Sequence, residues 1–313
     1  MFTVLIPFHG ESAWLARCLA GFSTQDFHEP FEVVVIDNDT PGPAPSGVFE
    51  RYREHLQLSV VRRSGLSSPL AMSSARNRGL ALAQYEWIVH MDADCVPGPE
   101  HLHRLHARIT AARGDNLLLF GVRRFINSEH LDEKSILDGS IDWSRLPEVA
   151  SPSNYGIMGD RRLPELVQVS SSEQPWAYAQ TCNLTHRFDA ACGVGGFDEA
   201  FSCPGEPGIQ LDTELSLQMW RLGYQVGLSY SAVSNGVGGR KTRTNRQQKK
   251  ARLLNDALNG QRCERVMRVH DAAAVAKANE ALERIPRPEA ARERTLEKLG
   301  MRPAKGCEAV DLH

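Results

Sequence analysis

The stretch that decides the fold is "WIVHMDADCVPGPEHL", residues 87–102. Its apolar start leads directly into two carboxylates, Asp92 and Asp94, which are separated by the small residue Ala93. Turn-forming residues, Pro-Gly-Pro at 97–99, follow almost at once. On a strand, residues two apart point to the same side. The pattern therefore predicts a buried strand that ends with two like charges side by side.

Two adjacent carboxylates are costly to bury unless something neutralises them. A divalent cation does this, and hard oxygen ligands suit Mn²⁺ or Mg²⁺, which often bridge carboxylates to phosphates. Asp94 and Asp92 are therefore the predicted metal ligands. Two acidic residues in a solvated turn are the alternative, because this spacing alone is common.

The chain before and after this stretch alternates between apolar strand-like runs and amphipathic helical runs. That order is typical of an α/β fold with a doubly wound parallel sheet, in which ligands bind beyond the carboxyl ends of the strands. Asp37, Asp39, Asp92 and Asp94 lie at such ends, so we expect them around one crevice. The predicted strands are 2–8, 31–39, 58–63, 87–94, 116–122 and 224–233, and the predicted helices are 12–22, 72–85, 99–109 and 213–223.

Other segments carry weaker patterns. Residues 127–170 are rich in Ser, Pro, Asp and Glu, which predicts an irregular excursion with one short helix. A basic run spans 240–252, and the tail from about 251 has helical periodicity interrupted by "IPRP" at 285–288. The basic run is either a lid over a diphosphate or a solvated or membrane-facing patch. Three histidines on one predicted helix, at 101, 103 and 106, are expected to be exposed or to lie on the helix flank.

The composition excludes several classes of protein. Hydrophobic residues make up 42%, charged residues 24%, and the net charge is −2, which argues against a general nucleic-acid binder. No apolar run reaches the length of a transmembrane segment, and the start lacks a leader pattern, so a cytoplasmic protein is expected. Seven dispersed cysteines without a C-x-x-C pair favour reduced thiols over disulfides.

Taken in order, the motifs resemble those of the GT-A-fold glycosyltransferases of family 2. They are "VLIPFHGESAW" at 4–14, "FEVVVIDNDT" at 31–40, "ARNRG" at 75–79, the D-x-D at 92–94, "GVGGFDEAF" at 193–201 and "LDTEL" at 211–215. The resemblance implies a Rossmann-like, mostly parallel sheet flanked by helices, with an acceptor-side subregion and a helical C-terminal tail. It also implies an inverting, metal-dependent transfer from a nucleotide sugar, of which a UDP-sugar is the commonest.

The resemblance assigns a set of residues to the nucleotide sugar. Asp92 would contact the ribose and Asp94 the metal, while Asp37 or Asn38 would bond the uracil or ribose. The full set is Pro7, Phe8, His9, Glu11, Asp37, Asn38, Arg76, Asn77, Asp92, Ala93 and Asp94. An Arg fork suits a diphosphate, which favours this role for Arg76.

The resemblance also places the catalytic base at Asp212, which would take the proton from the attacking acceptor. Leu211 stands where the family has Glu, so Glu214 or Glu206 is an alternative base. The family's metal-binding His after the last strand is absent. The residues expected on the acceptor side are Trp176, Gly195, Gly196, Asp198 and Glu214.

The implied organisation has three parts. Residues 1–125 form the nucleotide-sugar half, residues 126–235 the acceptor and base half, and residues 236–313 a basic loop and helical extension that could pair two copies. The acceptor hydroxyl or thiol would belong to a soluble small molecule, glycan or peptide. A catalytically degenerate nucleotide-sugar-binding protein is the main alternative. A sugar-1-phosphate nucleotidyltransferase is disfavoured, because the glycine-rich basic loop after the first strand is missing.

Overall fold

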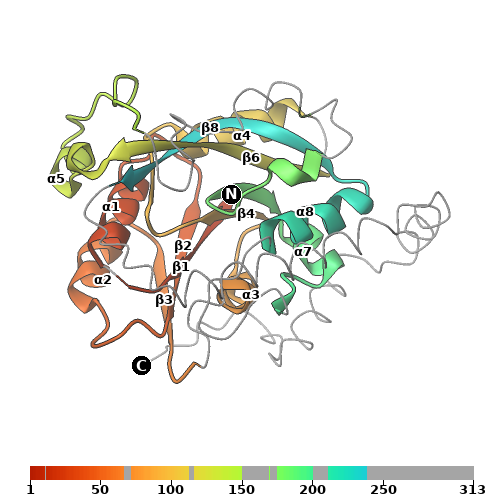
Figure 1. Cartoon of the computed structure of the whole chain (residues 1–313), viewed down its shortest axis with the longest axis horizontal. Coiled ribbons are helices and arrows are strands. Elements are labelled where there is room, and N and C mark those ends of the chain that lie inside the picture. Colours follow the sequence, from red (N-terminus) through yellow and green to blue (C-terminus); the bar gives the residue numbers. More distant parts are fainter. Residues whose placement is uncertain are drawn as a thin grey trace, which may run out of the picture.

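A single eight-stranded sheet organises the molecule, with helices on both faces (Figure 1). The computed structural model describes residues 1–10, 12–66, 72–112, 116–149, 169, 175–199 and 211–237. The predicted α/β fold is confirmed. Glu11, Glu206, the basic run 240–252 and the C-terminal tail lie outside these residues.

The strands and helices follow the predicted order closely. The strands are β1 Phe2–Phe8, β2 Phe31–Asn38, β3 Leu58–Arg63, β4 Trp87–Met91, β5 Cys95–Pro97, β6 Leu117–Asn127, β7 Asn183–Arg187 and β8 Gln225–Val237. The helices are α1 Ser12–Ser23, α2 Ser46–Arg53, α3 Met72–Leu82, α4 His101–Ala111, α5 Glu133–Leu137, α7 Phe188–Val194 and α8 Leu211–Arg221, with short 3-10 turns η1 Ser128–His130 and η4 Pro175–Tyr178.

The strand order in the sheet is β3-β2-β1-β4-β7-β6-β8-β5. The first four strands are mutually parallel, β7 runs antiparallel to both β4 and β6, and β8 runs parallel to β6. The sheet is therefore mostly parallel, as expected, with β7 and β5 reversed. The three-residue β5 was not expected, since its pairing with β8 is a long-range contact that no local pattern shows.

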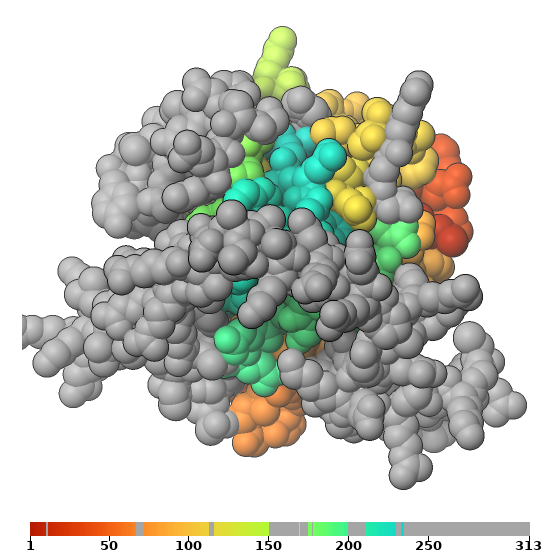
Figure 2. Space-filling view, turned by 90° about the vertical axis from the view of Figure 1, so that its right-hand side faces the viewer, coloured from red at the N-terminus to blue at the C-terminus, as the bar shows by residue number. Residues whose placement is uncertain are grey.

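Two apolar layers cover the two faces of the sheet, and alternate residues of β1 supply both. Val4 and Ile6 pack with Leu15 and Leu19 of α1, whereas Leu5 packs with α3, α7 and α8. This is the two-residue period of a strand that is buried on both faces. Figure 2 looks onto the side of α7 and α8, where green and cyan segments from residue 183 onward lie above orange atoms of the α3 region.

Several expectations need correction or refinement. His101 was expected to be exposed or on the helix flank, but it is fully buried against the ring of Phe22, with centroids 6.4 Å apart. The glycine-rich segment at 193–201 is not all loop, because α7 continues to Val194 and ends at Gly195 in the left-handed region, φ 83°. In the described part of the excursion, α5 is the one short α-helix expected. β6 runs through the predicted boundary at 125/126, so one sheet is shared by both halves. No helix among the described residues is long and apolar enough to cross a membrane.

Candidate active site

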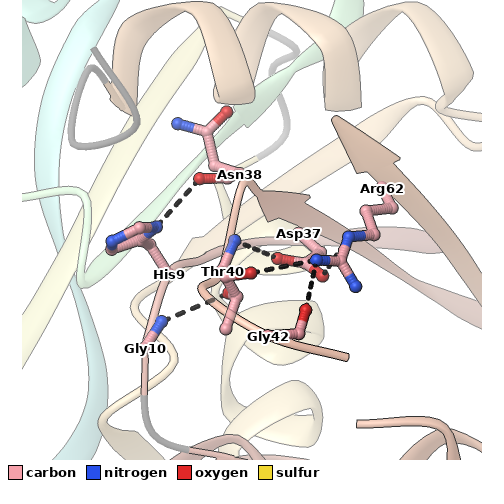
Figure 3. Close-up of polar contacts among 7 residues, drawn as sticks. All are labelled: His9, Gly10, Asp37, Asn38, Thr40, Gly42 and Arg62. Atoms are coloured by element: carbon pink, nitrogen blue, oxygen red, sulfur yellow. Dashed lines mark hydrogen bonds and ion pairs between the residues drawn. The ribbon is translucent and has the colours of Figure 1, made fainter. Parts of the chain in front are cut away.

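The loop after β1 is tied to the end of β2 by two polar contacts, and a third braces the end of β2 itself (Figure 3). His9 Nδ1 lies 2.9 Å from the backbone oxygen of Asn38, and the Gly10 N–H donates to Thr40 Oγ1 at 3.2 Å. The Thr40 N–H in turn donates to Asp37 Oδ1 at 3.0 Å. Because β1 and β2 are parallel neighbours, these contacts join their carboxyl ends into one rim of the site.

Asp37 and Asn38 are fully buried beneath that rim. Asp37 Oδ2 lies 3.7 Å from Arg62 Nε, and Asn38 Oδ1 accepts a hydrogen bond of 2.9 Å from Arg63 Nη1. The contact of Asp37 or Asn38 with a uracil or ribose stays a prediction. In this structure their side chains hold the strand ends, and the nearby Asp39, at φ 63°, marks a tight turn of the rim.

Pro7 and Phe8 were predicted to line the nucleotide base, and their placement differs from that prediction. Both are buried, and Phe8 belongs to the apolar layer on the α1 face. β1 ends at Phe8, as predicted, and all seven of its residues are buried, so the chain becomes accessible only beyond the strand. His9, the next residue, is half-buried and is the one of the three with a side chain at the rim.

The D-x-D comes directly after β4 and lies in a turn, because β4 ends at Met91 and does not continue to residue 94 as predicted. Asp92, Ala93 and Asp94 are each partly exposed, and the Cys95 N–H donates to the Asp92 carbonyl at 3.0 Å, closing a tight turn. Asp92 and Asp94 thus offer hard carboxylate oxygens within one turn, a donor set that fits Mn²⁺ or Mg²⁺.

Arg76 on α3 is the cation of the site. Its side chain is only 2% exposed, and Nη2 donates to Asp92 Oδ1 at 2.7 Å. The guanidinium carbon lies 5.9 Å from the ring centroid of Phe197, within cation–π range. Its Nε and Nη1 have no hydrogen-bond partner among the described residues. A buried guanidinium with unused donors is an arrangement suited to binding an anion.

Asn77 was predicted to face the nucleotide, and the structure gives it another role. Its Oδ1 accepts from the Phe197 N–H at 2.8 Å, while Nδ2 donates to the Phe197 carbonyl and to Glu199 Oε1, both at 2.9 Å. Gly196, at φ 76°, passes so close that an added Cβ would lie 2.6 Å from Asn77 Oδ1. Asn77 therefore clamps the loop of Gly195 and Gly196 onto α3.

Asp212 lies in the first turn of α8, as predicted. Its carboxylate accepts from the backbone N–H groups of Thr181, at 3.3 Å, and Thr213, at 3.0 Å. Burial raises the pKa of Asp212, while those two N–H groups and the positive charge of Arg76 oppose the rise. A carboxylate with a raised pKa beside a cation is suited to accept a proton near neutral pH.

Glu214, the alternative base, is 7% exposed and accepts from Gln218 Nε2 at 3.1 Å, one turn along the same helix. Burial also raises its pKa. Trp176, expected to stack on an acceptor sugar, is instead 3% exposed within the apolar layer of α8, so neither face of its ring is open. Asp198 is exposed on the clamped loop.

The link between the two acidic centres was missed by the sequence analysis. Thr181, whose N–H binds Asp212, is followed by Cys182, whose sulfur lies within 4.8 Å of a carboxylate oxygen of Asp92. Thr181 acts through its backbone, and no residue-type pattern identifies such a contact. Arg76 makes the second link, because it binds Asp92 and its charge acts on Asp212.

Comparison with known proteins identifies the family. Residues 3–158 match the family model described as glycosyl transferase family 2. The chain is 27% identical over 230 residues to the hyaluronan synthase of Pasteurella multocida, covering 71% of this chain and 23% of that protein. It is 26% identical over 278 residues to the validoxylamine A glucosyltransferase of Streptomyces hygroscopicus subsp. jinggangensis, covering 86% of this chain and 61% of that protein. The chain thus spans about a quarter of the first relative and three fifths of the second.

The fold has solved counterparts as well. The crystal structure of GalNAc-T7 with UDP, GalNAc and Mn²⁺ superposes with a TM-score of 0.56 at 15% identity, covering 96% of this chain and 55% of that one. At this identity the likeness concerns the fold alone. The matched motif region and the shared sheet architecture agree with the motif order described above, and the chain belongs to glycosyl transferase family 2.

Proposed function

We propose that the protein is an inverting, metal-dependent glycosyltransferase that uses a UDP-sugar. The observation that carries the proposal is the meeting of three groups: Arg76 binds Asp92 of the D-x-D at 2.7 Å, and the same cation acts on Asp212 at the start of α8. A metal-binding carboxylate, a buried cation and a carboxylate of raised pKa are the parts that such a transfer requires. The name of one relative, validoxylamine A glucosyltransferase, supports a sugar transfer, and the UDP in the GalNAc-T7 structure supports the choice of a UDP-sugar as donor.

In the proposed reaction, Asp212 accepts the proton of the acceptor hydroxyl or thiol. At the same time the acceptor's oxygen or sulfur bonds to the anomeric carbon of the sugar. The bond from that carbon to the diphosphate breaks on the opposite face, so the configuration inverts. Arg76 offers its unused N–H donors to the negative charge of the leaving group. A divalent cation held by Asp94, with Asp92 beside it, would supply further positive charge there.

Asp212 is the base in this proposal rather than Glu214, on two grounds. Asp212 is held by two N–H groups and lies within the field of Arg76, whereas Glu214 is bonded to Gln218 along its own helix. Leu211, the departure from the family pattern, is 5% exposed and packs in the apolar layer. Its apolar side chain leaves the neighbouring Asp212 in place.

The first test is thermal unfolding with UDP, GDP, dTDP, CDP or ADP, each with and without Mn²⁺. At about 100 times its dissociation constant, a nucleotide should stabilise the fold by about 2.7 kcal/mol, a shift of several degrees. We expect this for UDP with Mn²⁺ and its loss in Asp94→Asn. Asp142→Asn, at an exposed acid outside the site, is the matched control. Absence of a shift for every nucleotide would contradict the proposal.

A degenerate, non-catalytic binding protein is the second candidate. It is favoured by Leu211, which stands where the family has an acidic residue. Turnover separates the two functions. We expect slow, metal-dependent release of UDP from a UDP-sugar by the wild type, with water as acceptor, and its loss in Asp212→Asn. A nucleotide shift without any release would support the binding protein instead.

A further inference from the structure

Two buried thiols lie directly behind the D-x-D. Cys95 is 0% and Cys182 2% exposed, and their sulfurs lie with a carboxylate oxygen of Asp92 within 4.8 Å of one another. Asp92 and Cys95 belong to the turn between β4 and β5, and Cys182 is the residue before β7. Neither the family motifs nor the proposed transfer uses either thiol.

Two features of the main chain, a strand pairing and a tight turn, fix this arrangement. β4 and β7 are antiparallel with Met91 opposite Asn183, so one further step along both strands brings Asp92 beside Cys182. The turn that closes with the Cys95 N–H on the Asp92 carbonyl, at 3.0 Å, folds Cys95 back onto the same residue. The cluster therefore follows from strand pairing and a tight turn rather than from the conformations of surface side chains.

The donor set and its spacing match a thiophilic cation. Zn²⁺ binds thiolates at about 2.3 Å and carboxylates at about 2.0–2.2 Å in tetrahedral sites, which places the ligand atoms roughly 3.5–3.8 Å apart. The three atoms here need to approach by only about 1 Å. Mn²⁺ and Mg²⁺ prefer oxygen ligands, whereas thiolates select zinc-like ions. We propose that Asp92, Cys95 and Cys182 form a binding site for Zn²⁺ or a similar thiophilic divalent cation.

Asp92 controls both the access of an ion to the two thiols and the competition between the thiolate site and the hard-metal position. Its side chain is 36% exposed, so an ion can reach the buried sulfurs past it, and each ligating thiol releases its proton. Asp92 also accepts the hydrogen bond of Arg76. A zinc ion on Asp92 would draw the carboxylate away from that cation and from the hard-metal position at Asp94. If the proposed function holds, Zn²⁺ therefore antagonises UDP and Mn²⁺ binding.

The test uses Co²⁺ as a spectroscopic stand-in, because only thiolate ligation gives a sulfur-to-cobalt charge-transfer band. The full chain is titrated under a non-thiol reductant, with Cys203, Cys263 and Cys307, which lie outside the described residues, changed to Ser. We expect a band that saturates near one equivalent and disappears when Zn²⁺ is added. Cys182→Ser should abolish it, and Cys192→Ser, at a buried cysteine of α7, should leave it unchanged.

Each outcome decides the proposal. No band, or a band that survives in Cys182→Ser, overturns it. Circular dichroism melting checks that Cys182→Ser is folded, and Cys182→Ala provides a second variant. In the wild type, Zn²⁺ should also raise the melting temperature where Mg²⁺ does not. A cobalt band in a protein that shows no nucleotide shift leaves the thiolate site standing while the proposed function fails. A thermal shift with UDP but no cobalt band would support the proposed function and overturn the thiolate site.

Discussion

At the scale of single residues, the ionised carboxylate of Asp212 lowers the stability of the fold. Asp212 accepts two backbone hydrogen bonds and lies in the field of Arg76, yet burial still raises its pKa. A carboxylate whose pKa rises on folding contributes stability below its unfolded pKa and loses it as pH rises through the folded pKa. At pH 7 the ionised Asp212 therefore opposes folding, a cost that fits a functional rather than a structural role.

Asp212→Asn tests both the functional role of Asp212 and the cost of its charge to folding. We expect transfer or donor hydrolysis to fall at least about 100-fold, because the general base is lost. The melting temperature at pH 7 should stay equal or rise, because a charge that opposes folding is removed and the amide oxygen can still accept from Thr181. Kinetics and thermal unfolding give the two readouts. If Asp212→Asn keeps activity near the wild-type level, the general base would be Glu214 instead, and Glu214→Gln is the variant that tests this.

At the scale of elements, the position of the D-x-D turn depends on how closely α1 approaches β5. Gly21 of α1 lies against Pro97, and a Cβ added there would meet the Pro97 carbonyl oxygen at 2.7 Å and Cδ at 2.8 Å. Gln25, just after α1, donates to the Gly98 carbonyl at 2.7 Å. The helix and the Pro-Gly-Pro turn thus act together to set where the chain leaves the two carboxylates.

Gly21→Ala should destabilise the protein, although alanine is the better helix former. The added methyl meets a backbone oxygen and a proline ring carbon, neither of which can rotate away, at an overpacking cost of about 1–3 kcal/mol. Gly47→Ala in α2 is the control, because nothing lies within 4 Å of its Cβ and the change should stabilise by about 0.5 kcal/mol. Urea unfolding of both variants measures the difference. Equal stabilities would show that α1 is free to move away from β5.

At the scale of the whole molecule, one sheet joins the donor side to the base side at the β4–β7 pair, where strand direction reverses. His90 of β4 and His186 of β7 are fully buried there, with their Nε2 atoms 2.9 Å apart. His186 Nδ1 lies 2.8 Å from the Arg187 carbonyl and donates to it, so its Nε2 accepts from His90. The join is held by two neutral imidazoles.

This pair predicts acid sensitivity. Burial lowers the pKa of His186 to about 4 and also lowers that of His90. The unfolded chain takes up protons first, so the free energy of unfolding should fall as pH drops from about 6.5 toward 4, by about 3 kcal/mol for His186. Urea unfolding against pH measures this. His186→Gln, which cannot titrate, should flatten the curve, whereas exposed His103→Gln should not. A flat wild-type curve would contradict the prediction.

The sequence by itself determined the family and most of the elements in their order, whereas α2, β5, β7 and α7 were not predicted. Apolar periods of two and 3.6 residues are local properties, so β1, β2, β4 and α8 could be predicted within a few residues. The motifs placed Asp92, Asp94 and Asp212 at a strand end and a helix start, where the structure has them.

Only the tertiary structure decided what the neighbouring side chains do. Phe8 lies in the core because α1 covers it, Asn77 clamps Phe197 from 120 residues away, and β7 brings Cys182 beside Asp92. Such contacts depend on pairings between distant segments, whose free energy is set by packing and by which buried polar groups find partners. A residue's type and its sequence neighbours carry no record of those pairings, so the fold alone assigns these roles.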